Sequence, residues 1–148
     1  MMIDNIVNRI KSITESNLYT WVDEYIEANK SRLVTDIQNR LKRGDSVHDV
    51  NDVIGEYKSV AYRMFKQRMN PLAGGSVDLF LTGDLQRFLI IEKRSKNIFK
   101  IYSKDDKYKM LANKYGKEQF GLTEEQNTEL MINIHAHLIK KIFEKILK

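Results

Sequence analysis

Apolar residues recur at three- and four-residue steps through the first 43 residues, which is the spacing of one face of an α-helix. The recurrence covers 3–13 and resumes over 18–41, with a polar stretch between them. A break is expected there because Ser16 and Asn17 both favour the N-cap position of a helix. Gly44 follows two basic residues, a usual signal for a helix end. The pattern therefore predicts helix over nearly all of this region, interrupted once.

A second helix is expected to begin at Ser46, with Asp49 three residues later in a weak form of the capping box. Apolar residues then recur at helical spacing along 47–65. Asn70 precedes Pro71, the only proline, and the residue before a proline is disfavoured in the helical conformation. We therefore predict that this helix runs from Ser46 to Asn70.

The character of the sequence changes after these helices. The run FLIIEKRSKNIFKIYS (88–103) is rich in Ile, Phe and Tyr, and it predicts an antiparallel hairpin over about 86–103 with its turn at 95–97. The first strand begins as an apolar run, so we expect it to be buried on both faces. VDLFL (77–81) is interpreted as a short strand or an extended approach to this hairpin.

Two further helices complete the chain. Residues 106–116 predict a short helix closed by a glycine, and Thr123 forms a capping box with Gln126 at the start of a helix that continues to the C-terminus. This order predicts an α+β fold with long N-terminal helices, a small antiparallel sheet and a C-terminal helix packed on the sheet. The length of 148 residues suits a single domain, with a helical N-terminal part (1–70) and an α+β assembly part (71–148).

The net charge of +5 is concentrated in one segment. Residues 87–117 hold ten basic side chains against three acidic ones, which is more than the whole excess. Such a segment suggests a surface that faces an acidic partner. The other interpretation is a solvated lysine-rich face, and the sequence leaves both open. The residues predicted to contact an acidic partner are Lys93, Arg94, Lys96, Lys100 and Lys104.

Two aromatic residues alternate with these lysines. Phe99 and Tyr102 stand beside Lys100 and Lys104, an arrangement that could stack nucleic-acid bases and contact phosphates. Aromatic residues on the strands of a small domain are usually part of its core. We therefore expect the two rings to be buried and only the lysines to be exposed.

The stretch NPLAGGSVDLFLTGDL (70–85) holds three of the seven glycines and the only proline. A phosphate-binding P-loop needs a lysine and a hydroxyl residue directly after its glycines, but Asp84 and Leu85 follow the last glycine here. We interpret the stretch as a structural joint between the helical part and the sheet. The residues expected to provide its turns and backbone freedom are Pro71, Gly74, Gly75, Thr82 and Gly83.

The residue types do not form a convincing catalytic constellation. Asp78, Asp84 and Glu92 lie on or beside predicted strands, as the carboxylates of a two-metal nuclease do, but Arg94 stands where the lysine of a Glu-x-Lys motif is expected. The two histidines of the last helix point about 200° apart and cannot share a metal ion. The absence of cysteine excludes disulfides and thiolate metal sites. We expect a non-enzymatic protein without a cofactor.

The composition, 42% hydrophobic and 30% charged, is typical of a globular chain. No apolar run approaches the ~20 residues of a membrane span, so no membrane partner is expected. The amphipathic tail LIKKIFEKILK (138–148) is expected to pack on the sheet or on a neighbouring subunit.

DLFLTGDLQRFL (78–89) resembles the L-x-x-T-G-x-L-x-x-S/F segment of tailed-bacteriophage virion morphogenesis proteins. This group includes tail-completion, tail-terminator and neck (head–tail connector) proteins. Two strands follow in that group, then a piece ending in Tyr-Gly or Gln-Gly, then a Phe-(Leu)-Gly-Leu-Ser/Thr motif that caps a C-terminal helix. The same order appears here as FLIIEKRSKNIFKIYS, DKYKMLANKYG and QFGLTEEQNTEL. The resemblance covers 77–135, and KEQ (117–119) replaces a piece that often contains arginine.

The resemblance implies a structural virion protein, made in the host cytoplasm and assembled as a homo-oligomeric ring in the neck or upper tail. Such a ring is expected to contact the portal or an adaptor on one side and tail or neck proteins on the other, with DNA passing through its lumen. A ring is built from heterologous contacts, so two different faces of each subunit must be apolar or matched in charge. The alternatives are a small basic nucleic-acid-binding protein and, less favoured, a metal-dependent nuclease.

Overall fold

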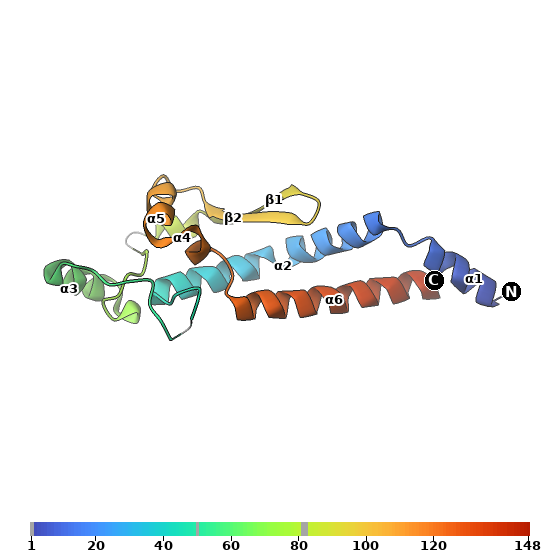
Figure 1. The fold of residues 1–148 in the computed structure, drawn as a ribbon, viewed down its shortest axis with the longest axis horizontal. Coiled ribbons are helices and arrows are strands. Elements are labelled where there is room, and N and C mark those ends of the chain that lie inside the picture. The colour runs from blue at the N-terminus through green and yellow to red at the C-terminus, as the bar shows by residue number, and fades with distance from the viewer. Residues whose placement is uncertain (1, 50, 81–82) are drawn as a thin grey trace.

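The fold is an elongated α+β arrangement, as the sequence predicted. The computed structural model describes residues 2–49, 51–80 and 83–148. The α-helices found in these residues are α1 (Met2–Lys11), α2 (Glu15–Arg43), α3 (Val60–Met69), α4 (Asp84–Arg87), α5 (Tyr108–Tyr115) and α6 (Glu124–Leu147); the strands are β1 (Leu89–Ser95) and β2 (Ile98–Ser103), and Pro71–Ala73 and Lys117–Phe120 form 3-10 turns. Figure 1 shows α2 and α6 side by side, the hairpin along α2, and α3 at the end away from both termini.

The predicted break in the N-terminal helical region is confirmed, but a different residue caps the second helix. The side chain of Thr14 accepts a hydrogen bond from the backbone N–H of Asn17 at 3.3 Å, and the Asn17 side chain accepts from the Thr14 N–H at 3.0 Å. Asn17 is therefore the third helical residue of a capping box, and Ser16 lies within the first turn. The predicted end is confirmed at Gly44, whose positive φ of 78° suits glycine.

The prediction of a helix from Ser46 to Asn70 is wrong in its first half. The helix begins at Val60, and the Ser59 hydroxyl caps it by accepting from the Tyr62 N–H at 3.3 Å. Aspartate side chains in the preceding loop hydrogen-bond to nearby backbone N–H groups, including that of Asn51, which donates to the Asp49 side chain at 2.8 Å. Such local bonds compete with helix formation and favour turns. The predicted end at Asn70 is confirmed.

The hairpin is antiparallel, with Leu89 opposite Ser103 and Ile91 opposite Ile101. Its start corrects two expectations. Residues 84–87 form the short helix α4 rather than the beginning of the strand, and the described part of VDLFL contains no strand. The expectation that β1 is buried on both faces is also wrong. Leu89 and Ile91 face the core, but Ile90, which points to the opposite face of the sheet, is only partly buried, and the strand becomes exposed toward its end.

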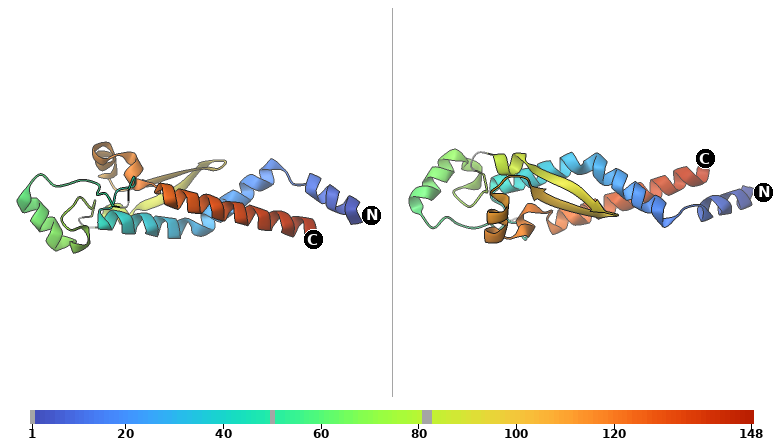
Figure 2. Two further views of the ribbon diagram at one scale, coloured as in Figure 1. Left: turned by 60° about the horizontal axis from the view of Figure 1, so that its bottom comes forward. Right: turned by 90° about the horizontal axis from the view of Figure 1, so that it is seen from above.

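The core consists of two clusters that meet along α2. One lies around the C-terminal end of α2 and contains Ile37, Leu41 and Phe120 among its buried residues. The second joins Ile26 and Leu33 of α2 to Ile91 of β1 and Ile134 of α6. The C-terminal helix therefore packs along α2 and meets the sheet through this second cluster, as Figure 2 shows from two further directions.

The start of α6 is the capping box that the sequence predicted. The Gln126 backbone N–H donates to the Thr123 hydroxyl at 3.1 Å, and the Thr123 N–H donates to the Gln126 side chain at 2.9 Å. At the other end of the helix, the Arg9 guanidinium of α1 donates to the Ile146 carbonyl at 2.8 Å. The capping box fixes where α6 leaves the core, and α1 extends beside its last turn.

Candidate assembly surfaces

The predicted basic contact residues do not form one uniform patch. Lys93 turns toward α2, where its ammonium group pairs with Asp23. Arg94 pairs with Glu92 of its own strand at 2.9 Å. These two cations are therefore already paired within the subunit, which reduces what they can offer to an acidic partner. Exposed ion pairs of this kind contribute at most about 1 kcal/mol each to stability.

Two of the other lysines lie over aromatic rings. The Nζ atom of Lys96 is 5.6 Å from the ring centroid of Tyr19 in α2, and that of Lys100 is 5.0 Å from the ring centroid of Tyr102. Tyr102 is half-buried on the outer face of the hairpin, contrary to the expectation that both aromatic rings belong to the core. Phe99 does pack against the cluster around Ile91, as expected.

A basic groove lies between β2 and α5. It has a volume of 630 Å³, and four lysines line it against two aspartates, Asp105 and Asp106. Lys100 and Lys104 were predicted as contact residues, but Lys109 and Lys117 were not, because only the fold brings α5 and the following turn beside β2. The lysines and tyrosines of this basic groove are Lys100, Tyr102, Lys104, Tyr108, Lys109 and Lys117.

The basic groove has the chemistry to hold a phosphate or carboxylate. One of its aspartates is engaged locally, because the Asp105 side chain accepts from the Lys107 N–H at 2.8 Å. The ring of Tyr108 is held in place by an edge-on contact with the ring of Phe120, with the ring centroids 4.9 Å apart. Lysine ammonium groups can pair with a bound anion, and an aromatic ring held in place beside them can pack against an apolar part of the same ligand.

The glycine-containing stretch forms a compact joint. Pro71 opens a 3-10 turn, and the positive φ angles of Gly74, Gly75 and Gly83 are 58°, 89° and 82°. A Cβ on Gly75 would lie 3.0 Å from the Cγ atom of Arg63, so the Arg63 stem packs closely over this glycine. Thr82, the fifth predicted joint residue, lies outside the described residues.

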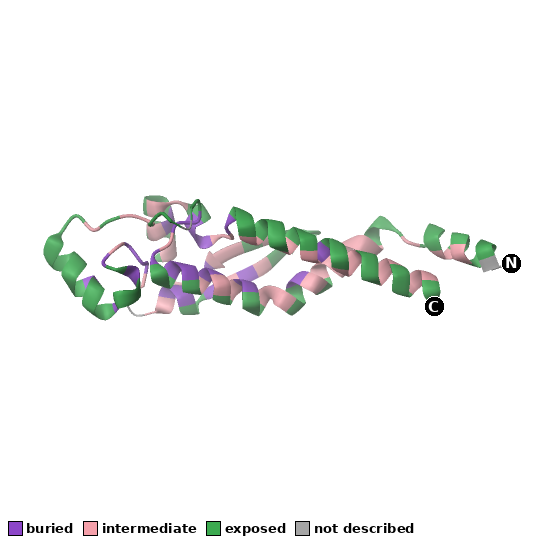
Figure 3. Cartoon of the chain, turned by 90° about the horizontal axis from the view of Figure 1, so that it is seen from below, coloured by how far each residue is buried: buried purple, intermediate pink, exposed green. Residues whose placement is uncertain are grey.

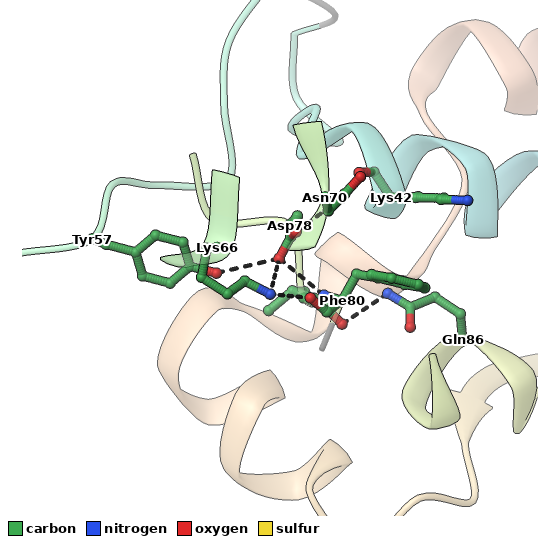
Figure 4. A network of polar contacts seen from close by, with 8 residues as sticks. Lys42, Tyr57, Lys66, Asn70, Asp78, Phe80 and Gln86 are labelled. Atoms are coloured by element: carbon green, nitrogen blue, oxygen red, sulfur yellow. Dashed lines mark hydrogen bonds and ion pairs between the residues drawn. The ribbon is translucent and has the colours of Figure 1, made fainter. Parts of the chain in front are cut away.

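A buried ion pair holds the joint to the rest of the protein. The Lys66 ammonium lies 2.7 Å from the Asp78 carboxylate, and their side chains are 3% and 0% exposed. Lys66 also donates to the Phe80 carbonyl. Asp78 further accepts from the Asn70 side chain at 2.8 Å and from the Phe80 N–H at 3.0 Å, as Figure 4 shows. The Asn70 amide also reaches the Lys42 carbonyl at 2.6 Å, which connects this network to the end of α2.

Tyr57 completes the network and provides a pH-dependent prediction. Its hydroxyl donates to Asp78 at 3.2 Å, and burial together with the Asp78 carboxylate raises the pKa of Tyr57 above its ordinary value of 10.0. The unfolded chain releases this proton near pH 10 while the folded chain keeps it, so stability falls as the pH rises above 10.

We expect Tyr57→Phe to lose less stability than the parent protein between about pH 9 and about pH 11, because it has no phenol to titrate. Urea unfolding at the two pH values measures the difference. Equal losses in the two proteins would show that the Tyr57 phenol is not buried beside the carboxylate.

A second buried cation, Arg40, was missed by the sequence analysis. Its guanidinium donates to the carbonyls of Gln119 at 2.5 Å, Gly121 at 2.9 Å and Asp45 at 3.1 Å. Burial lowers the pKa of Arg40 to about 10, so the group remains charged at neutral pH. The Gln119 side chain accepts in turn from the Val47 N–H at 3.0 Å. Arg40 therefore ties the QFGLT motif to α2. The sequence signal that could have revealed the role of Arg40 is the position of this arginine on the apolar face of a helix.

The three carboxylates considered for a nuclease site have separate local roles. Asp78 belongs to the buried ion pair, Asp84 lies 3.5 Å from Arg87 of its own short helix, and Glu92 accepts from the Tyr102 hydroxyl at 2.9 Å. Within the part of the chain that the structure describes, no group of three His, Cys, Asp or Glu side chains is arranged to hold a metal ion.

Many of the exposed large apolar side chains fall in two sets at opposite ends of the molecule, and Met131 and Ile132 are exposed between them on α6. The first set, on and beside α3, is Val60, Tyr62, Met64, Phe65, Met69 and Leu72. The second, on α1 and the last turns of α6, is Ile3, Val7, Ile10, Ile139, Phe143 and Leu147. Figures 1 and 3 show how far apart these helices lie and that α3 is exposed along most of its length. Exposed apolar clusters of this kind are typical of surfaces that a partner covers.

Among the described residues, none of the helices combines the length and the apolar character needed to cross a membrane. Comparison of the chain with family models, with curated proteins and with solved structures found no match in any of the three.

Proposed function

We propose that this protein is a non-enzymatic structural subunit of a ring in the neck or upper tail of a tailed bacteriophage particle. The observation that carries the proposal is the presence of unlike apolar surfaces on one subunit, one on α3 and another along α6 and α1. A closed ring requires two different surfaces on each copy, each complementary to the other. The order of sequence motifs over 77–135, which resembles that of tailed-phage virion proteins, is the reason for placing the proposed ring in a phage particle.

The motifs behind that resemblance have architectural roles in the fold. The segment around Asp78 is held by the buried ion pair with Lys66, and the QFGLT segment is held by two hydrogen bonds from Arg40. Both segments pack around the C-terminal end of α2, where the first core cluster lies. Motif residues that fix the shape of a subunit are what an assembly protein requires, whereas an enzyme needs side chains that converge on an open cleft.

In this proposal the ring is homo-oligomeric, with the portal or an adaptor on one side and tail or neck proteins on the other. The basic groove is the surface offered to an acidic neighbour or to DNA in the lumen. Its four lysines exceed its two aspartates, so it attracts anionic surfaces at moderate ionic strength.

We expect the purified protein to form one closed assembly whose mass is a fixed multiple of 17.4 kDa. Native mass spectrometry measures the multiple, negative-stain electron microscopy shows whether the species is a ring, and peptide mass spectrometry tests for the protein in purified particles. A protein that remains monomeric at every concentration and is absent from particles would contradict the proposal.

Nucleic-acid binding is the second candidate function, and the basic groove is the observation that favours it. We expect such binding to weaken steeply with salt, because each phosphate contact releases counterions. The slope of the logarithm of the binding constant against the logarithm of the salt concentration is negative. Removing one contact by Lys104→Gln or Lys109→Gln should reduce the magnitude of this slope by about 1. Lys30→Gln, on the exposed side of α2, is the matched control and should leave the slope unchanged. Affinity that does not depend on salt would exclude this function.

A further inference from the structure

The helix α3 lies almost entirely outside the core of its own subunit. Lys66 is its one buried residue, and the other nine are exposed. A helix of ten residues is marginal on its own in water, since short helices depend on packing for stability. The sequence nevertheless places five large apolar side chains on α3, and all five are exposed, although the ring of Tyr62 meets that of Tyr57 edge-on at 5.0 Å.

The exposed face of α3 can be located from its anchor. Successive residues on a helix are about 100° apart, so Met64 and Arg68 lie opposite Lys66, with Val60 and Phe65 at the two edges of that side. This docking face is therefore apolar with a basic centre. Ala61 lies on the same side and allows another helix to approach closely.

A groove with an apolar lining and an acidic border lies over the first half of α6. It has a volume of 770 Å³ and is bordered by carboxylates of Glu118 and Glu124. This second groove, which we call the α6 groove, is distinct from the basic groove. Its apolar lining is Val47, Ile101, Leu122, Met131 and Ile132.

The α3 docking face and the α6 groove match in charge. Residues 58–69 contain four basic residues and no acidic residue, and one of the four, Lys66, is neutralised by Asp78. Residues 118–135 contain four acidic residues and neither lysine nor arginine. Of these four, Glu118 and Glu124 border the groove, and Glu118 has an exposed contact with the His48 imidazole at 3.7 Å, which a partner's cation can replace.

The two surfaces also match in length. At a rise of about 1.5 Å per residue, the ten residues of α3 span about 15 Å, and the part of α6 that borders the groove, 124–135, spans about 18 Å. In Figure 1, α3 projects beyond the end of α2 and away from α6 of its own chain. This α3 therefore does not fill the α6 groove of its own subunit, and only the α3 of another copy could do so.

We infer that α3 of one copy docks into the α6 groove of the next copy, with Met64 and Phe65 against Met131 and Ile132, and with Arg68 facing Glu124. This contact joins two different surfaces and therefore repeats head to tail from copy to copy, as a ring requires. The inference rests on the proposed ring assembly, and it identifies the surfaces that form the ring.

Charge reversal tests the pairing. Arg68→Glu and Glu124→Lys should each weaken self-association roughly tenfold or more, because each places like charges at the contact, and the double variant should regain most of the loss. Glu125→Lys is the matched control, because it adds the same charge to the same helical turn but does not line the groove. Sedimentation velocity over a concentration series measures association, and circular dichroism confirms that each variant is folded.

Cysteine cross-linking tests the geometry, because the chain has no cysteine of its own. Ala61→Cys on α3 and Thr128→Cys in the α6 groove should cross-link when the two single variants are mixed under oxidising conditions, and neither should form a dimer alone. A chain with both changes should give a ladder of covalent oligomers.

The outcomes separate this inference from the proposed function. Cross-linking of Ala61→Cys to itself would indicate a twofold contact between α3 helices and would overturn the inference. A ring that forms normally despite both charge reversals and without the cross-link would also overturn it, while the proposed ring function would stand. A monomer under all conditions would overturn both.

Discussion

Replacing Asp78 by asparagine is expected to lower the free energy of unfolding by about 3–5 kcal/mol. The side chain keeps its size, but Lys66 is left as a buried cation without a counter-charge. Both side chains are almost completely inaccessible to water, at 3% and 0% exposure, so solvent cannot compensate for the loss. Urea unfolding followed by circular dichroism measures the change.

Two further variants separate the ion pair from general disturbance of the joint. Lys66→Met combined with Asp78→Asn should destabilise by less than the sum of the single changes, because the double variant has no unpaired buried charge. Asp45→Asn is the surface control. It removes the carboxylate that lies 2.6 Å from the exposed Arg43 and should cost less than about 1 kcal/mol. Additive losses at positions 66 and 78 would contradict a coupled pair.

The second large effect is expected at Arg40. Arg40→Met should lower the free energy of unfolding by about 3 kcal/mol, because the Gln119 and Gly121 carbonyls lose a charged donor and remain buried or partly buried. Arg40→Lys should recover little of this loss. One ammonium group cannot reproduce the fork with which the guanidinium reaches carbonyls on both sides.

Arg43 provides a matched control for this prediction. It lies three residues along the same helix, is exposed, and forms a surface pair with Asp45. Arg43→Met should therefore change stability by less than about 1 kcal/mol. Thermal unfolding of the two methionine variants gives the comparison directly. Equal losses would mean that the hydrogen bonds from α2 to the QFGLT segment do not stabilise the fold.

The regular elements could be predicted because their signals are local. The heptad-like recurrence of apolar residues defines α2, and Gly44 marks its end with a backbone conformation that glycine adopts easily. The hairpin follows from its β-branched and aromatic residues, and the start of α6 follows from Thr123 and Gln126, three residues apart. Each of these signals lies within one turn or one strand of the element it specifies.

The joint could not be predicted in the same way, because its side chains are satisfied by distant partners. Arg40 reaches carbonyls 79 and 81 residues later in the chain, and no local pattern identifies such acceptors. From the sequence Asp78 is a candidate metal ligand, and only the fold places Lys66 beside it. Lys109 and Lys117 could not be assigned to the basic groove for the same reason, because only the fold brings them beside β2.

The loop before α3 shows where periodicity misleads. Val47 and Val53 fit a helical face, but the Asp49 side chain bonds the Asn51 N–H, and the Ile54 N–H donates to the Gly44 carbonyl at 2.9 Å. Ser46 similarly donates its backbone N–H to the Asp52 carbonyl at 2.9 Å. These bonds close a compact loop instead of a helix. Aspartate at two positions within four residues was the competing local signal.

Because Lys66 is the one buried residue of α3, its buried ion pair with Asp78 is the main contact that holds this helix to the subunit. Amide hydrogens of α3 should therefore exchange with solvent through a local opening, much faster than those of α2 in the free subunit. Docking onto a neighbouring copy would close that opening and slow exchange throughout the helix. If α3 docks as proposed, assembly would follow an order: the core of the subunit folds first, and α3 becomes rigid only on contact with a neighbouring copy.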